Sequence, residues 1–558
     1  MGKIHKLDKD LIPKIAAGEV VDRPSSVIKE LLDNSIDAEA KNIVIEIENG
    51  GKNLIKIIDD GEGMDKEDLE KCYQPFTTSK ISKEEHLNNI VTMGFRGEAL
   101  NSIASISKVT IKTKTATEDT GYELNIEGGK TKKIKPVGMA KGTVIEIRDL
   151  FFNVPARKKF LKSDASEVKQ IIFLIEKFAL SHWDKSFKLI NNKKETINIS
   201  SSKNLLERIE DLFGNNSEKL LNVSAQNEYL TLTGYVGSPS LSSYTNINNA
   251  FFVNKRYVEN KKTNHAIKNA YGKLIENHSN PFYILFLNLM PSLVNVNIHP
   301  QKKEVNFWND TEVENFIQKS IQEILATKAV TYDSDYFGNP LKKASKHQFN
   351  ELKEDTFNWN IKGIEEKNDF EELFQIANTY IVTHTKEGLV LIDQHAAHES
   401  ILYEQYLEKY LDKTHDTEVL EVNELIEFSN TLKFLLETNM EILEYHGFDI
   451  TNFGGNTFKI STIPQLFKDH DIKKLLEEIL VNIEDQNGKI SVDEKTKQTI
   501  AFLACRGAIK AGEKLTKTEM VNLCEKLEKS QGYLTCPHGR PTKITVPIKD
   551  MEKIFKRI

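Results

Sequence analysis

The 558-residue sequence lacks any apolar run long enough to cross a membrane, for which about 18 residues are needed. Its opening segment, MGKIHKLDKDLIPKIAAGEV, also lacks the hydrophobic stretch of a secretory leader. Only four cysteines occur, at positions 72, 505, 524 and 536, too few for a disulfide scaffold. These absences predict a protein of the cytoplasm, where thiolates stay free to bind metal.

A strong positive charge is absent as well. The net charge of −7 excludes a protein that coats nucleic acid over its whole surface, so any DNA contact must come from local basic patches. A solvated loop explains each patch taken alone. The candidate contacts are Arg157, Lys158, Lys159 and, in a second segment, Arg256.

The segment DQHAAHESILYE, residues 393–404, follows the apolar run GLVLI and predicts a strand that leads into a helix. On that helix His395 and Glu399 are four residues apart and share one face, so they could bind one cation together. Asp393 sits at the turn, whereas Glu404 points away from the pair.

Two later segments add soft ligands. Cys505 lies in ACRG, and Cys536 and His538 lie in CPHGRP. One carboxylate, two imidazoles and two thiolates suit zinc or a related divalent ion. Taken singly, Cys505 is better explained as a buried apolar residue and His395 as a core histidine, but the three segments together favour a metal site. Their order resembles the endonuclease motifs of the MutL family of DNA mismatch repair proteins.

Near the start of the chain, SSVIKELLDNSIDAEA has the helical period, with an apolar face that includes Val27 and Leu31. Glu30 and Asn34 form part of a polar stripe on another side. A strand then ends at Asp59, before a glycine turn in which a ligand could approach the backbone closely. A second glycine-rich segment leads into another helical pattern, where backbone amides could bind phosphate. The candidate residues in these loops are Gly61, Gly63, Thr78, Ser79, Lys80, Gly94, Phe95, Arg96, Gly97, Glu98, Ala99 and Leu100.

In this order the segments resemble the GHKL ATPase fold, and the strings GFRGEAL and KGTVIEIRDLFFNVPARKKFL narrow the resemblance to MutL. The resemblance implies that Glu30 is the general base for ATP hydrolysis and Asn34 a ligand of the nucleotide's Mg²⁺. Asp59 would accept from the adenine amino group, with Thr143 nearby. Lys302, in HPQKKEVNF, would reach the γ-phosphate.

The chain is too long for a single core, so an α+β multidomain protein is expected. The resemblance implies an N-terminal GHKL α/β sandwich over residues 1–205 and a transducer subdomain over 206–330. A polar segment over 331–368 is interpreted as the linker. Residues 369–558 would form a C-terminal α/β dimerisation and endonuclease domain, with a regulatory subdomain inserted at 426–495.

The function implied by the resemblance is an ATP-gated homodimeric clamp that couples mismatch recognition to strand nicking, with Asp393 and Glu399 as catalytic residues. Its cofactors would be ATP and Mg²⁺ at the ATPase site and Zn²⁺, Mn²⁺ or both at the endonuclease site. Double-stranded DNA and the mismatch-recognition protein MutS would be partners, and the location would be cytoplasmic, at the nucleoid. Binding to the replication sliding clamp stays open, because EVLEVNELIEF lacks the family's glutamine-led segment.

The alternative is an ATP-driven matchmaker clamp without nuclease activity, in which four closed ligands hold a structural metal. Another GHKL enzyme, such as a topoisomerase or a kinase, is disfavoured. The sequence shows neither a tyrosine-centred cleavage domain nor a phosphoacceptor histidine motif.

Overall fold

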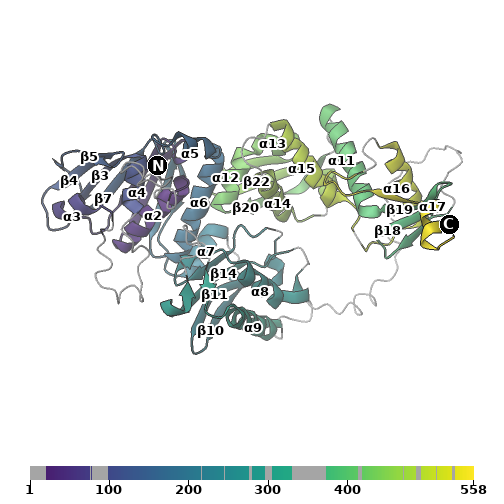
Figure 1. Ribbon diagram of the computed structural model, residues 1–558, viewed down its shortest axis with the longest axis horizontal. Helices are drawn as coiled ribbons and strands as arrows, with labels where there is room; N and C mark the ends of the chain where they lie inside the picture. The colour runs from purple at the N-terminus through teal and green to yellow at the C-terminus, as the bar shows by residue number, and fades with distance from the viewer. Residues whose placement is uncertain are drawn as a thin grey trace, which may run out of the picture.

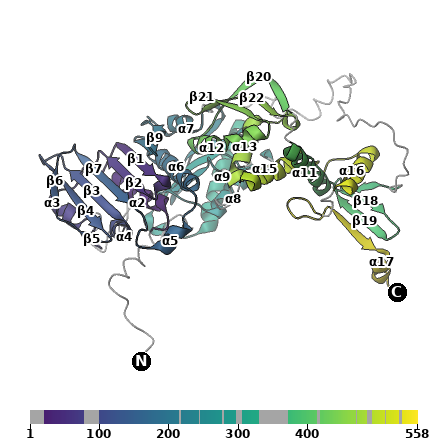
Figure 2. The same cartoon turned by 90° about the horizontal axis from the view of Figure 1, so that it is seen from above.

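The α+β multidomain architecture is confirmed by a computed structural model, which contains sheets of nine, five, four, three and two strands together with helices. It describes residues 21–75, 77, 99–214, 217–243, 245–275, 279–295, 305–329, 372–412, 417–468, 470–484, 492–510, 512–530 and 535–557. The nine-stranded sheet lies at one end of the molecule and the four-stranded sheet at the other, with the three-stranded sheet between them (Figures 1 and 2). Within these residues, none of the helices is both long and apolar enough to span a bilayer.

The N-terminal part is a nine-stranded sheet covered by helices. Its strands are β1 (Asn42–Glu48), β2 (Leu54–Asp59), β3 (Lys108–Lys114), β4 (Gly121–Glu127), β5 (Lys130–Thr131), β6 (Lys135–Val137), β7 (Gly142–Arg148), β8 (Ser186–Asn191) and β9 (Lys194–Ile199). Its helices are α2 (Pro24–Asp37), α3 (Lys66–Lys71), α4 (Ala99–Ile106), α5 (Pro155–Phe160), α6 (Asp164–Ser181) and α7 (Leu205–Phe213). The strand order is β5-β4-β3-β7-β2-β1-β8-β9, with β6 paired to β4. Helices α2 and α6 pack against each other and against this sheet.

Helix α2 forms where the helical period predicts it. Val27, Ile28, Leu31 and Leu32 are buried in the N-terminal core because apolar side chains three and four residues apart share one face of a helix. Ile36 is only partly buried and packs against this core. The polar stripe is therefore left on the side of α2 that turns away from the core.

The next part of the chain has its own sheet and core. Its strands are β10 (Leu220–Gln226), β11 (Leu230–Gly237), β12 (Ala250–Val253), β13 (Arg256–Tyr257), β14 (Tyr283–Leu289), β15 (Val294–Asn295) and β16 (Asn306–Phe307), and its helices are α8 (Lys261–Tyr271) and α9 (Asp310–Ala329). The first five strands form one sheet in the order β10-β11-β14-β12-β13, and α8 packs against α9. We call this part the transducer. Helix α7, which begins at Leu205, packs in the N-terminal core, so that core extends past the expected boundary at 205.

The C-terminal part holds two sheets. One consists of β17 (Phe374–Ile376), β18 (Tyr380–His384), β19 (Gly388–Asp393) and β23 (Lys543–Pro547), with helices α11 (Gln394–Asp412), α15 (Val492–Gly507), α16 (Lys517–Lys529) and α17 (Ile548–Ile554). The other consists of β20 (Thr417–Glu427), β21 (Asp449–Gly454) and β22 (Thr457–Pro464), with helices α12 (Asn430–Thr438), α13 (Met440–Tyr445) and α14 (Ile472–Glu484).

The second set of elements, from β20 to α14, is what we call the inserted subdomain. It has a hydrophobic core of its own, which α15 shares through Leu503. Its sheet begins at Thr417, ahead of the expected boundary at 426. The inserted subdomain thus separates α11 from α15 in sequence, whereas these two helices pack together in the structure.

Candidate functional site

Two groups of potential metal ligands meet at the carboxylate of Glu399 on α11. His395, Glu399 and Cys505 form one group, and Glu399, Cys536 and His538 form the other. Within each group the ligand atoms all lie within 4.8 Å of one another. The structure therefore brings together all five ligands that the sequence predicts, from three separate segments, and Glu399 is common to both groups.

The surroundings of Glu399 favour a cation. Its side chain is only 1% exposed, and its carboxylate contacts the Nδ1 atom of His538. Burial, together with the negative charge of Glu399, raises the pKa of the Cys505 thiol to about 11. Burial and a hydrogen bond with the same carboxylate also raise the pKa of Cys536. A divalent cation would reverse this effect, because it stabilises thiolates and carboxylate together, so these donors fit zinc or a related ion.

His395 is held in place by the backbone at the end of α15. Its Nδ1 atom lies 2.9 Å from the carbonyl oxygen of Ile509. The N–H of the same residue, Ile509, donates to Nδ1 of His398 at 3.0 Å. His398 is not among the residues expected from the sequence, and its position one turn after His395 is the one sequence signal for a supporting role.

Asp393 lies next to the metal ligands but in neither group of ligand atoms. Its Oδ1 atom accepts from the backbone N–H of His395 and of Ala396, both at 3.0 Å. Asp393 therefore caps the first turn of α11 and helps to fix the orientation of the helix turn that carries His395. Glu404, farther along the same helix, also lies outside both ligand groups found among the described residues.

At the other end of the molecule, Asp59 occupies a buried polar position at the end of β2. Its carboxylate accepts from the Ser35 hydroxyl at 2.9 Å and from the Gly61 N–H at 3.0 Å. Burial raises its pKa, although these hydrogen bonds counteract the shift. Thr143 lies directly opposite Asp59 in the β2–β7 pair, so the expected proximity of these two residues is present.

Helix α2 carries two further candidates, Glu30 and Asn34, next to this strand. Glu30 is half-buried and lies 3.4 Å from the amino group of Lys29, while Asn34 is exposed. Lys29 also pairs with the buried Asp33 at 3.3 Å. The structure thus places a carboxylate and an amide one turn apart on the same side of α2.

The two glycines after Asp59 are required by the chain's own backbone. A Cβ at Gly61 would lie 2.7 Å from the carbonyl oxygen of Ala38. Gly63 has a φ of +77°, and a Cβ there would lie 2.2 Å from the carbonyl oxygen of Lys114. Both glycines therefore allow close packing of this turn against neighbouring backbone.

Part of the expected nucleotide site lies outside the described residues. This applies to Thr78, Ser79, Lys80, Gly94, Phe95, Arg96, Gly97, Glu98 and Lys302. Ala99 and Leu100 are described and form the first turn of α4.

The basic candidates fall into two settings. Lys158 and Lys159 are exposed on α5, and Arg157 beside them is half-buried. Arg256 lies on β13 of the transducer, where its charge acts on Lys29 and Asp33 of α2. The positive charge on α5 is thus exposed to solvent, whereas that of Arg256 acts on residues of α2.

Comparisons with known proteins agree with this arrangement. Residues 22–149 match the model of the histidine kinase-, DNA gyrase B- and HSP90-like ATPases, and residues 209–326 match the C-terminal domain of DNA mismatch repair proteins. Residues 373–515 match the MutL C-terminal dimerisation domain. The DNA mismatch repair protein MutL of Clostridium acetobutylicum is 37% identical, and the alignment covers 100% of both chains. The chain belongs to the MutL family.

The resemblance seen in the sequence is thereby confirmed. The MutL of Clostridium tetani is also similar, at 35% identity over 100% of both chains. Among solved structures, the N-terminal domain of a DNA repair protein aligns with a TM-score of 0.50 and 24% identity, covering 57% of this chain and 99% of that chain. From the family models, this MutL chain has the ATPase domain and the C-terminal dimerisation domain of its family, and Cys536 and His538 follow the matched dimerisation segment.

Proposed function

We propose that this MutL chain hydrolyses ATP in its N-terminal domain and, as a homodimer, nicks one strand of double-stranded DNA at the C-terminal metal centre. The observation that carries the nuclease proposal is the position of Glu399, whose buried carboxylate belongs to two adjacent ligand groups. A carboxylate has two oxygens, so one residue can bridge two sites. Structural zinc sites, in contrast, are closed by four ligands around one ion.

Nicking requires an open side to the metal centre. The side chain of His538 is 49% exposed, so the second ligand group faces solvent. Arg540 is exposed as well, and its positive charge lowers the pKa of Cys505, which indicates that it lies near the ligands. A phosphate approaching from this side would meet a cation on the protein before it reached the centre.

Divalent ions held by these residues would polarise a phosphoryl oxygen and activate water for hydrolysis of the phosphodiester. The protein's part is to hold the ligands in place. Asp393 caps the helix that carries His395 and Glu399, and Ile509 orients the His395 ring. We infer that Asp393 contributes to catalysis by this positioning, since its carboxylate is engaged with backbone N–H groups.

For the ATPase, the carboxylate of Glu30 would activate water and Asn34 would bind the Mg²⁺ of the nucleotide. The family resemblance implies that Asp59 accepts from the adenine amino group, and its buried position at the end of β2 is compatible with that role. Lys158 and Lys159 would contact the DNA backbone, with Arg157 beside them and Arg256 as a further contact from the transducer. MutS would bring the protein to mismatches.

The homodimer would form through the outer face of the four-stranded sheet. Ile376 lies opposite Tyr380 in the β17–β18 pair, and Leu391 lies opposite Ile544 in the β19–β23 pair. Ile376, Tyr380 and Ile544 are all exposed, although each is a large apolar residue. An apolar sheet face of this kind is typical of a dimer interface.

A plasmid assay separates nicking from the alternative of a clamp with a purely structural metal. Supercoiled plasmid is incubated with the protein and Mn²⁺, Mg²⁺ or Zn²⁺, and the relaxed form is measured. Glu399→Lys should abolish nicking, because a positive charge at the shared ligand repels cations, while Glu404→Ala should retain it. ATP hydrolysis should persist in both variants. Parental nicking by the Glu399 variant would exclude this centre as the nuclease site.

The ATPase proposal has its own test. Glu30→Ala should abolish ATP hydrolysis and leave ATP binding nearly unchanged, since the base is lost while the residues that bind the nucleotide remain. Glu67→Ala is the matched control, because Glu67 is an exposed acid on α3. Hydrolysis at the parental rate by the Glu30 variant would show that another group serves as the base.

A further inference from the structure

A fully buried carboxylate connects the ATPase domain to the inserted subdomain. Glu176 on α6 is 1% exposed, and its oxygens accept from the N–H of Thr431 at 3.2 Å and from the Thr431 hydroxyl at 2.5 Å. Thr431 lies in the first turn of α12, where the N–H groups lack partners within the helix and favour an acid. The two residues are 255 positions apart in the sequence.

The next residue on α6 makes the corresponding contact with the transducer. The amino group of Lys177 donates to the carbonyl oxygens of Asn249 at 3.0 Å and Ile247 at 3.3 Å. It also lies 4.4 Å from the ring centre of Phe173, as expected for a cation–π contact. Two adjacent charged residues of one helix thus bind two different parts of the chain.

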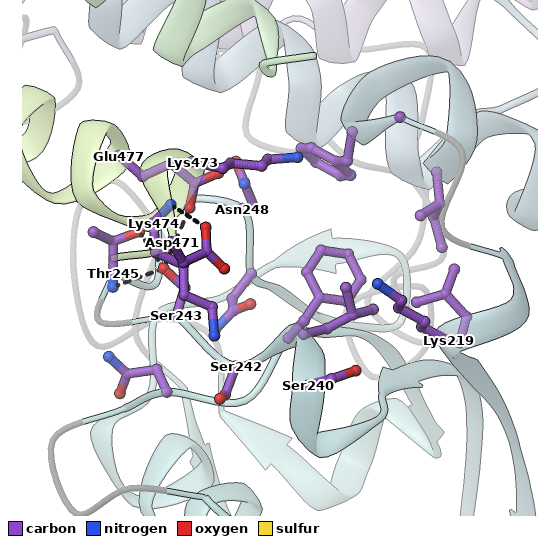
Figure 3. Close-up of a pocket in the computed structure, with 18 residues that line it drawn as sticks. Lys219, Ser240, Ser242, Ser243, Thr245, Asn248, Asp471, Lys473, Lys474 and Glu477 are labelled. Atoms are coloured by element: carbon purple, nitrogen blue, oxygen red, sulfur yellow. Dashed lines mark hydrogen bonds between the residues drawn. The ribbon is translucent and has the colours of Figure 1, made fainter. Parts of the chain in front are cut away.

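Apolar side chains cross the same junction in both directions. Phe434 of α12 packs against the N-terminal core, and Ile247 of the transducer packs against the core of the inserted subdomain. Nearby, the hydroxyl of Ser243 donates to the carboxylate of Glu477 on α14 at 3.3 Å (Figure 3). The contacts therefore come from helices and loops of all three parts.

Beside these contacts the junction leaves two open spaces, each lined by polar and apolar surface alike. A cavity of about 180 Å³ lies between the transducer and the start of α14, lined by Lys219, Ser243, Asn248, Asp471, Lys473 and Glu477 (Figure 3). A second cavity of about 1190 Å³ is lined by α6, the transducer and α14, and reaches Arg506 on α15. Protein cores are close-packed, so open spaces of this size are typical of an interface between separate bodies rather than of one continuous core.

We propose that the inserted subdomain is a docking module that binds reversibly to α6, to Ser243 and to residues 245–249 of its own chain, with the Glu176–Thr431 hydrogen bonds as the latch. The docked form places the metal centre at a defined position relative to the ATPase. The inserted subdomain is linked to the metal ligands through two packed helices. Helix α14 packs on α15, and Arg506 of α15 pairs with Glu478 of α14. The metal ligand Cys505 is adjacent to Arg506 in the sequence. The proposal does not depend on nuclease activity.

Hydrogen–deuterium exchange of the full-length protein tests the latch from both sides. Thr431→Val removes the hydroxyl donor from α12, so the amides of α6 that lie beneath it should exchange about tenfold faster, as expected for the loss of a hydrogen bond to a buried charge. Thr438→Val is the matched control. Thr438 is exposed at the end of α12, and its hydroxyl bonds only within that helix to Phe434 among the contacts described. This control should leave α6 unchanged.

The reciprocal variant, Glu176→Ala, lies outside the inserted subdomain and leaves its sequence intact. It should accelerate exchange in α12 and leave β22, in the centre of the inserted sheet, at the parental rate. Faster exchange in β22 would reveal that Thr431→Val unfolds the inserted subdomain. In that case the Glu176→Ala variant alone tests whether the subdomain docks on α6. Parental exchange in α12 of the Glu176 variant would overturn the proposal, because the α6 face would then be uncovered in solution.

Discussion

The Nδ1 atom of His395 lies 2.9 Å from the carbonyl oxygen of Ile509, and this contact fixes the tautomer of the ring. A carbonyl oxygen can only accept, so Nδ1 carries the hydrogen and the neutral ring presents its lone pair at Nε2. Ile509 is in turn held by His398, whose Nδ1 accepts from the Ile509 N–H at 3.0 Å. Burial lowers the pKa of His398 to about 4, so that its ring is neutral and able to accept near pH 7.

We therefore expect His398→Leu to weaken zinc binding by about tenfold to a hundredfold, although His398 belongs to neither ligand group. The Ile509 N–H would lose its acceptor, and the backbone that orients His395 would be less well held. His398→Gln should restore part of the affinity, because an amide oxygen can accept the same hydrogen bond. Zinc affinity is measured by competition with a chelator. The control is His384→Leu, at an exposed histidine on β18, and equal affinity in the two leucine variants would contradict the prediction.

A second prediction contrasts two adjacent carboxylates. Asp59→Asn should lower ATP affinity by about tenfold to a hundredfold and reduce the preference for ATP over GTP. The physical reason is that an amide can donate to the guanine carbonyl, whereas a carboxylate can only accept from the adenine amino group. Affinities for both nucleotides are measured by calorimetric titration.

Asp60→Asn is the control for this pair. The Oδ1 atom of Asp60 accepts from the backbone N–H of Lys41 at 2.7 Å and of Asn42 at 2.9 Å, so its role is to hold the start of β1. This variant should change stability more than nucleotide preference. An unchanged ATP preference in Asp59→Asn would show that Asp59 does not contact the base.

The sequence predicted those features that depend on local spacing. The i, i+4 relationship of His395 and Glu399 is visible without a structure, as is the apolar face of α2. The contact between His398 and Ile509 cannot be seen in the sequence, because the two residues are 111 positions apart. The Glu176–Thr431 contact could not be predicted either, because these residues are 255 positions apart. In addition, a charged residue within a helix is usually exposed to solvent.

The start of the inserted sheet is also difficult to recognise from the sequence. The segment TEVLEVNELIE forms β20, but its burial does not alternate regularly, and the β20–β22 register shifts between Val419 and Glu424. Such an irregularity breaks the period of two by which a strand is identified. Val419 and Val422 are left exposed, which is the opposite of what their apolarity suggests.

A third prediction concerns assembly. Ile544→Asp should convert the dimer to a monomer, because it places a charge on the outer face of the four-stranded sheet, opposite Leu391. Val422→Asp is the control, since Val422 is 82% exposed on the unrelated sheet of the inserted subdomain. Mass is measured by sedimentation equilibrium at matched concentrations. A dimer in the Ile544 variant would place the interface elsewhere.

The last prediction uses the buried amine of Lys177. Burial lowers its pKa from 10.5 to about 8, although the nearby carboxylates of Glu176 and Glu259 oppose the shift. Between pH 8 and 10.5 the unfolded chain therefore binds a proton at this lysine that the folded chain does not, and stability must rise with pH across this window.

Lys177→Met keeps the long side chain and removes the titration. The free energy of unfolding of the parent, relative to this variant, should rise by up to about 3 kcal/mol from pH 8 to 10.5 and stay level below pH 8. Urea unfolding of both proteins at a series of pH values measures the difference, and a difference that is constant across the window would show that Lys177 stays charged in the folded protein.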